Sequence, residues 1–342
     1  MELMNFDEVI KKIEKTKGKR SWNLLMGNGF SISYSPTMFS YNVLHDFVKS
    51  KDDEVLSILF DCIKTSNFEL IMKQLDTTLS LAQNFDADDE FISKLVDANE
   101  KLKKSLITAI QTLHPDHVFR IEENESKTCS EFISMFLETK GEIFTTNYDL
   151  LMYWVLMRNQ IKDICDGFSR EVEFDEENFD ERQEGDLIWG WNKENQNIHY
   201  LHGTLPFFDS GISIIKEEYD GNYLLDKIKM RIKNDEYPIF VTSGSGRDKL
   251  EQIKHNAYLA FCYDRLSRVT GSIVSYGFNF GKYDEHIIAA INKATKFNGK
   301  GKLLSIYIGV YSEDDKEYIE SIKDKFKCKV SIFDSKTAHI WG

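Results

Sequence analysis

The sequence predicts an α/β fold in which helices cover both faces of a parallel sheet. Short, unbroken apolar runs recur along the 342 residues, each is followed by a turn, and helical patterns lie between several of them. Continuous apolar runs are typical of parallel strands, because both faces of such strands are buried. We expect a single domain over residues 1–342, with a helical insert at 40–135 after the first strand.

The elements before and within the insert follow from apolar spacing. A short amphipathic helix comes first, and the apolar run at 22–26 forms the first strand. Apolar residues three and four positions apart then predict three helices, and His114-Pro115 breaks the last of them. The three ranges are 56–63, 68–81 and 91–113.

Further strands are predicted after the insert, and a turn follows each of them. The expected strands are GEIFTTN at 141, IHYLHG at 198, YPIFVTSGSG at 237, GSIVSYGF at 271, LLSIYIGVY at 303 and CKVSIFD at 328. Helices are expected between several of these strands, at 149–156, 249–266, 284–294 and 314–326.

Composition excludes several classes of protein. The formal net charge is −13, and an acidic surface repels DNA and RNA, so we expect no direct nucleic-acid partner. No apolar stretch approaches the ~18 residues that span a bilayer, and the N-terminal segment has no signal-peptide pattern. We therefore expect a cytoplasmic protein that does not enter the membrane.

The cysteines and histidines lead us to expect no metal. Five dispersed cysteines without a CxxC pair fit neither a disulfide framework nor a zinc module. His199 and His202 are three residues apart in an expected strand, so their side chains point to opposite faces. The cysteines are Cys62, Cys129, Cys165, Cys262 and Cys328.

The segment 170–186, REVEFDEENFDERQEGD, stands apart from the rest of the chain. It holds nine acids and two arginines, with Phe174 and Phe179 between them. Its acids and its glycine do not stand in the register of a calcium loop. We expect a solvated surface loop or hairpin, and contact with a protein partner is the alternative.

The candidate functional residues are those just past the expected strands, because ligands of parallel sheets bind beyond the carboxyl ends of the strands. Taken alone, each polar tip has an ordinary explanation, such as a turn, a helix cap or a packed histidine. Five such tips at one edge of a sheet favour a binding site. They are Gly27-Asn28-Gly29-Phe30-Ser31, Thr145-Thr146-Asn147-Tyr148-Asp149, His202-Gly203, Ser243-Gly244-Ser245-Gly246 and Gly277-Phe278-Asn279.

The order of these tips resembles the sirtuin-like superfamily and, more narrowly, the sirtuin-like proteins of bacterial antiphage defence. The motifs are MGNGFSISY, TTNYDLLMYW, DGF at 166, YLHGTL and YGFNFGKYDEHI, and the resemblance covers most of residues 20–295. It points to a subgroup long catalogued only as a domain of unknown function. The resemblance implies a doubly wound (Rossmann-like) parallel sheet that binds NAD and carries a smaller inserted helical region.

The resemblance also implies roles for individual residues. Asn147 matches the asparagine that orients water and ribose hydroxyls, and His202 matches the general base. Asp284 is expected to cap the next helix and to hold its loop in place. The other residues implied in cofactor binding are Gly27, Asn28, Gly29, Phe30, Ser31, Thr146, Asp149, Gly277 and Phe278. Glycines at 27 and 29 are expected to let main-chain amides reach the pyrophosphate.

The activity implied is that of an NAD+ glycohydrolase, which cleaves NAD+ to nicotinamide and ADP-ribose and would serve as an antiphage defence effector. Deacylase sirtuins carry two pairs of closely spaced cysteines that hold zinc, and the absence of such pairs here argues against deacylation. An NAD-dependent deacylase, an ADP-ribosyl transferase and a non-catalytic nucleotide-binding subunit remain alternatives. Because unrestrained NAD+ loss would harm the host, we expect control by a separate sensor or regulatory protein from the same operon, or by self-assembly. The insert and the segment 170–186 are the expected docking surfaces.

Overall fold

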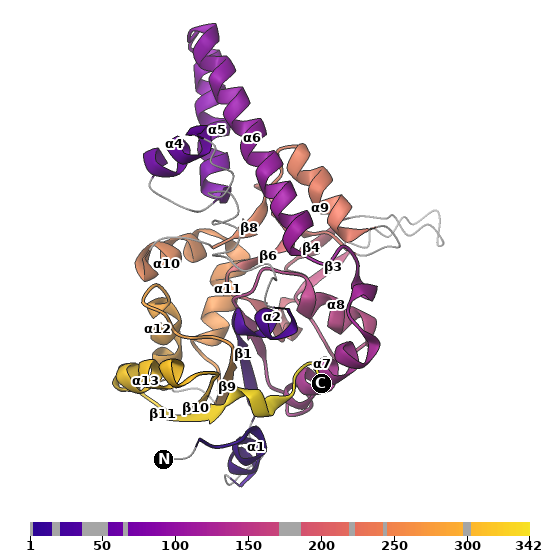
Figure 1. Cartoon of the computed structure of the whole chain (residues 1–342), viewed down its shortest axis with the longest axis vertical. Coiled ribbons are helices and arrows are strands. Elements are labelled where there is room, and N and C mark those ends of the chain that lie inside the picture. The colour runs from indigo at the N-terminus through magenta and orange to yellow at the C-terminus, as the bar shows by residue number, and fades with distance from the viewer. Residues whose placement is uncertain are drawn as a thin grey trace.

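The computed structural model describes residues 3–15, 21–35, 54–63, 68–170, 186–218, 223–241, 245–296 and 302–342. A six-stranded parallel sheet lies at its centre, in the order β11-β10-β9-β1-β2-β5 (Figure 1). The strands are β1 (Trp22–Met26), β2 (Ile143–Thr145), β5 (Ile198–Tyr200), β9 (Gly271–Tyr276), β10 (Leu303–Val310) and β11 (Lys329–Asp334). Residues of β2 and β9 are buried along their whole length, so both faces of the sheet are covered. The predicted α/β fold is confirmed.

The sheet is doubly wound. From β1 the chain adds β2 and then β5 on one side, and it later adds β9, β10 and β11 on the other side. The strand order therefore reverses between β1 and β9. In open α/β sheets a crevice forms at such a reversal, beyond the carboxyl ends of the strands, and ligands bind there.

A second sheet of five antiparallel strands, in the order β3-β4-β7-β6-β8, was not expected from the sequence. The run at 237 was predicted to join the parallel sheet, and this prediction is wrong, because β8 pairs antiparallel with β6. An apolar run indicates that a strand is buried, but it does not indicate which other strand it pairs with. The strands are β3 (Phe168–Arg170), β4 (Leu187–Trp189), β6 (Gly203–Asp209), β7 (Ile214–Lys216) and β8 (Pro238–Phe240).

The three helices predicted within the insert are present as α4 (Glu54–Ile63), α5 (Phe68–Asn84) and α6 (Asp89–Leu113). The packed pair α5 and α6 projects from the body of the molecule (Figure 1). The next helix, α7 (Glu123–Glu138), packs against β1 and β2 instead. The part that stands away from the sheet therefore ends before α7. Residues 36–53 and 64–67 of this region lie outside the described residues, as do 171–185 of the acidic segment.

The remaining helices connect or flank the strands. Their bounds are α1 (Phe6–Glu14), α2 (Gly29–Tyr34), α8 (Leu151–Arg158), α9 (Leu224–Lys233), α10 (Gly246–His255), α11 (Ala257–Leu266), α12 (Glu285–Ala294) and α13 (Glu313–Ile322). Short 3-10 helices are η1 (Val118–Arg120), η2 (Lys193–Asn195), η3 (Lys323–Lys325) and η4 (Ser335–Ala338). The helix predicted at 249–266 is two helices, because the extended Asn256 ends α10 and caps α11. Among the described helices, none combines the length and the apolar character needed to cross a bilayer.

Glycines hold the loops after β1 and β9 in direct backbone contact. A Cβ atom on Gly27 would lie 2.6 Å from the Cα of Phe278, and one on Gly29 would lie 2.6 Å from the Cα of Gly277. Gly277 itself has φ +66°, which only glycine adopts without strain. The glycines are therefore required where the two halves of the doubly wound sheet meet.

We expect Gly277→Ala to destabilise the fold much more than Gly211→Ala. Both glycines have positive φ, but a Cβ at 277 would lie 2.5 Å from the backbone nitrogen of Phe30, whereas a Cβ at 211 meets nothing within 4 Å. Left-handed strain alone costs roughly 1–2 kcal/mol, and overpacking adds about 1–3 kcal/mol at 277. Urea unfolding of both variants measures the difference in unfolding free energy. Equal losses of stability would contradict the packing argument.

Candidate functional site

Four of the five predicted tips begin at the same level of the parallel sheet. Met26 is the register partner of Thr145 and of Tyr276, and Thr145 is the partner of Tyr200. The loops that follow these four residues therefore leave one edge of the sheet side by side. The fifth tip, 243–246, follows β8 of the second sheet, and its residues 243 and 244 lie outside the described part of the chain.

The backbone amides of the glycine loop after β1 donate hydrogen bonds within the protein. The amide of Gly27 donates to the carbonyl of Tyr276 at 3.0 Å, and the amide of Gly29 donates to that of Gly277 at 2.8 Å. The β9 loop therefore occupies both donors, and contact of these amides with a pyrophosphate stays a prediction. Asn28 lies between them and is half-buried.

The two phenylalanines expected to line the cofactor are packed in the core. Phe30 is buried against Trp341, with ring centroids 5.0 Å apart, and its carbonyl accepts a hydrogen bond from the Trp341 indole at 3.1 Å. Phe278 is buried in edge-to-face contact with Phe280. Their packing fixes the two loops in place, and a role in cofactor contact remains a prediction.

A buried polar cluster joins the loops after β1 and β2. The Asn147 amide donates to the Ser31 hydroxyl at 2.9 Å, and that hydroxyl donates to the Asp149 carboxylate at 2.5 Å. Asp149 also accepts from the Leu151 amide at the start of α8, so it has the capping role that the sequence left open. The Thr146 amide donates to the Met26 carbonyl and ties the two loops together. We call Ser31, Asn147 and Asp149 the asparagine cluster.

Burial shifts the pKa of Asp149, the ionisable residue of the asparagine cluster. It raises the pKa of Asp149 from its ordinary value of 3.8 to about 6, while the hydrogen bonds from Ser31 and Leu151 pull the pKa down. At neutral pH the carboxylate is therefore ionised and can accept these bonds. A charged acceptor strengthens the hydrogen bond that orients Ser31, and Ser31 in turn orients Asn147.

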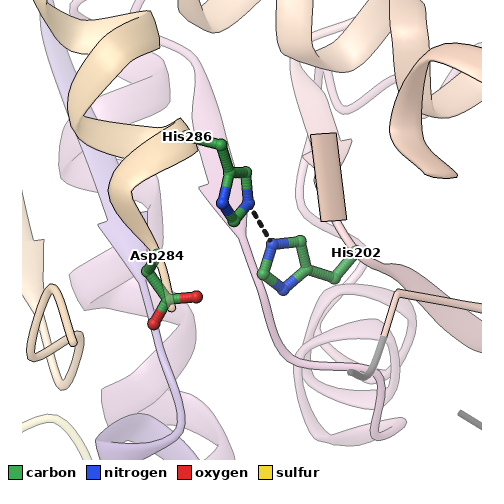
Figure 2. Close-up of side chains that lie close together, drawn as sticks. All are labelled: His202, Asp284 and His286. Carbon is green, nitrogen blue, oxygen red and sulfur yellow. Dashed lines mark hydrogen bonds between the residues drawn. The ribbon is translucent and has the colours of Figure 1, made fainter. Parts of the chain in front are cut away.

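A second buried cluster contains His202 from one loop and Asp284 and His286 from the start of one helix (Figure 2). His202 follows β5, and Asp284 and His286 lie at the start of α12. The Nε2 atoms of the two imidazoles are 2.9 Å apart, so one ring donates and the other accepts. Burial lowers the pKa of both rings, to about 3 for His286, so neither is protonated at neutral pH. We call this set the histidine cluster.

His286 was not recognised as a site residue from the sequence, although it stands in the motif YDEHI. The only signal was its spacing of two from Asp284, which the sequence assigned to a helix start. Asp284 occupies the N-cap position of α12, as predicted, but its side chain makes no capping bond. The carboxylate instead accepts from Lys249 of α10 at 2.9 Å.

The histidine cluster has the donor atoms of a metal site but not its surroundings. One ligand atom from each of His202, Asp284 and His286 lies within 4.8 Å of the others. However, the Lys249 ammonium already neutralises the Asp284 carboxylate. Metal-bound histidines also donate their second ring nitrogen to an acceptor, and no described residue accepts from Nδ1 of His286. These features favour a cluster without metal. His199 is engaged elsewhere, by Glu142 at 2.9 Å.

The profile of the family described as a domain of unknown function, DUF4917, matches residues 24–341. The chain belongs to the DUF4917 family. The match runs from within β1 to Trp341, so the DUF4917 domain includes both sheets, the projecting helices and both polar clusters. Comparison with curated proteins gives no match.

We expect the unfolding free energy of the wild type, compared with that of the Asp149→Asn variant, to fall as the pH rises from about 4 to 6. The unfolded chain releases the Asp149 proton near its ordinary pKa of 3.8, whereas the folded chain keeps it up to about 6. The stability contributed by Asp149 is therefore largest below pH 4, falls by at most about 3 kcal/mol and is constant above pH 6. Urea unfolding of both proteins at pH 4–7 measures this step.

The Ser31→Ala variant provides the matched test of the same step. Ser31 lowers the pKa of Asp149, so its removal should extend the fall in stability to higher pH. A stability difference from Asp149→Asn that does not change with pH would show that Asp149 is not held in this buried environment.

We also expect purified protein to contain no stoichiometric metal. The ammonium of Lys249 should exclude a divalent cation from Asp284, since like charges repel strongly in a buried site. Elemental analysis of freshly purified protein, with Lys249→Met as the matched variant, tests this expectation. One zinc, iron or manganese per wild-type chain would overturn it.

Proposed function

We propose that this chain is an NAD+ glycohydrolase that cleaves NAD+ to nicotinamide and ADP-ribose. The observation that carries the proposal is the equivalent placement of Asn147 and His202. Each lies two residues beyond one member of the register pair Thr145 and Tyr200, on neighbouring parallel strands. Both lie on the carboxyl side of the sheet, where ligands of parallel sheets bind. Asn147 bonds to Ser31 after β1, and His202 bonds to His286 of α12, which follows β9.

The chemistry of NAD+ cleavage suits these two side chains. Nicotinamide leaves as a neutral base, so the reaction needs an oriented ribose, a placed water and a proton acceptor rather than a strong acid. His202 is neutral at neutral pH, which is the form that accepts a proton. Asn147 carries no charge and can both donate to and accept from a water or a hydroxyl.

The asparagine cluster supports the role of Asn147 as an orienting residue. Ser31 engages its Nδ2 atom, so Oδ1 is the atom left to meet a water or a ribose hydroxyl. Ser31 is itself fixed by Asp149, and Asp149 is fixed by the Leu151 amide at the start of α8. A side chain held by such a chain of bonds is oriented before substrate arrives, which lowers the entropic cost of catalysis.

As a defence effector the enzyme would need a control element, and we propose that a separate protein from the same operon, or self-assembly, supplies it. The projecting helices α5 and α6 support this proposal. Near the turn between these helices, Leu81, Phe85 and Phe91 expose large apolar side chains, and 80% of the Phe85 surface is accessible. Exposed apolar groups at the end of a projection are suited to contact with another chain.

We expect Asn147→Ala and His202→Ala each to abolish NAD+ loss. General-base and orienting groups each contribute roughly 10²-fold or more, and truncation at the end of a strand leaves the apolar core in place. The assay measures nicotinamide and ADP-ribose from purified chain with NAD+, alone and with the products of neighbouring genes. Products without any added acceptor distinguish hydrolysis from deacylation and from ADP-ribosyl transfer.

The matched controls are Asn124→Ala and His255→Ala, which change exposed residues on α7 and α10. Both should keep full activity, and far-UV circular dichroism should be unchanged in all four variants. Full activity in either site variant, or no turnover of NAD+ by the wild type under any of these conditions, would refute the proposed function.

A further inference from the structure

The pairing of His202 with His286 has no part in the function proposed so far. The two residues are 84 positions apart, and their rings lie nearly parallel with centroids 5.1 Å apart (Figure 2). Only 6% of His202 and 3% of His286 is accessible to solvent. A buried polar pair of this kind persists only where each partner satisfies the other, because desolvation without a bond costs free energy.

We propose that His286 is the positioning residue of His202. It holds the His202 ring through Nε2, so that Nδ1 of His202 is the atom presented to a substrate hydroxyl. This inference rests on the proposed function, in which His202 accepts a proton from a ribose hydroxyl.

The position of His286 is itself well fixed. It lies in the first turn of α12, and its carbonyl accepts a hydrogen bond from Tyr263 of α11 at 3.1 Å. Asp284, two residues earlier, is tied to Lys249 of α10. Contacts with α10 and α11 therefore fix the backbone of α12 that carries His286, while His202 sits on a loop between β5 and β6. The rigid partner orients the one on the loop.

The proton balance of the step follows from the single proton shared between the two Nε2 atoms. When His202 donates through Nε2, its Nδ1 is bare and accepts the proton of the substrate hydroxyl. His202 then carries both ring protons, and its Nε2–H donates a charge-assisted bond to the neutral His286. No proton needs to leave the pair during this step. His286 carries its own proton on Nδ1, the buried nitrogen for which no described residue provides an acceptor.

That unsatisfied Nδ1 indicates a functional role. A buried donor without a partner costs about 1–3 kcal/mol, and an apolar side chain at 286 would avoid this cost. An imidazole at position 286 is explained, despite this free-energy cost, if its unprotonated Nε2 is needed to accept the hydrogen bond from His202. An unsatisfied buried polar group in a native structure calls for an explanation, and a catalytic role is one of the known ones.

Two amide substitutions separate positioning from general structure. The amide of glutamine reaches the place of Nε2, whereas the shorter asparagine amide reaches only the place of Nδ1. We expect His286→Asn to lower kcat on the order of 10- to 100-fold with little change in KM, and His286→Gln to restore most of it. The double variant His202→Ala/His286→Asn should be no less active than His202→Ala alone, because His286 acts only through His202. His255→Asn, on the exposed face of α10, is the matched control.

A second measurement does not depend on activity. In protein labelled with 15N-histidine, the proton between the two Nε2 atoms should give an imidazole N–H resonance protected from exchange. It should be present in the wild type and absent from both His202→Ala and His286→Asn. Persistence of the resonance in either variant would overturn the pairing.

The outcomes separate the inference from the proposed function. Unchanged kcat in His286→Asn, with the resonance lost, would overturn the positioning role while leaving NAD+ hydrolysis intact. Equal losses in His286→Gln and His286→Asn would also overturn it, because a purely structural effect would not be rescued. A wild type that shows the resonance but never cleaves NAD+ would refute the proposed function and the catalytic part of this inference together.

Discussion

The backbone contact between Gly29 and Gly277 is the constraint on which the site depends. The strand order reverses between β1 and β9, so the chain on either side of this point belongs to different halves of the sheet. At the reversal the loops would ordinarily diverge and leave a crevice. Here a 2.8 Å hydrogen bond joins them, and a side chain on either glycine would prevent it. The contact brings Ser31 beside the β2 loop and directs the β9 loop toward α12.

Two buried polar clusters link the strand ends to neighbouring elements. The asparagine cluster links β1 with β2 through Ser31, and the histidine cluster links β5 with α12 through His286. Buried polar groups are tolerated because each cluster is hydrogen-bonded internally, although no described residue provides a partner for the buried Nδ1 of His286. Each cluster also ties together segments that are more than 80 residues apart in the chain. The clusters are therefore both the candidate chemistry and part of what fixes the loops.

Sequence reasoning located the residues that stand directly after a strand. Asn147, Asp149 and His202 were selected because a polar residue that ends a buried apolar run is conspicuous, and the register of β1, β2 and β5 brings their loops to one edge. It failed where the partner is distant. The run at 237 joined the second sheet, and the Asp284 side chain bonded to Lys249 instead of to an amide of its own helix. Nothing within ten residues of either position reveals those partners.

Local interactions therefore explain some features of this protein, and contacts between distant segments explain the others. The strands of the parallel sheet and the helices of the insert follow from the sequence, because apolar spacing and the break at His114-Pro115 act over a few residues. The packing of the glycines after β1 against the β9 loop, which engages their amides, follows from tertiary contacts. The pairing of His202 with His286 likewise follows from tertiary contacts. Each such contact joins segments that are far apart in the chain, and no local pattern encodes a match in shape between them.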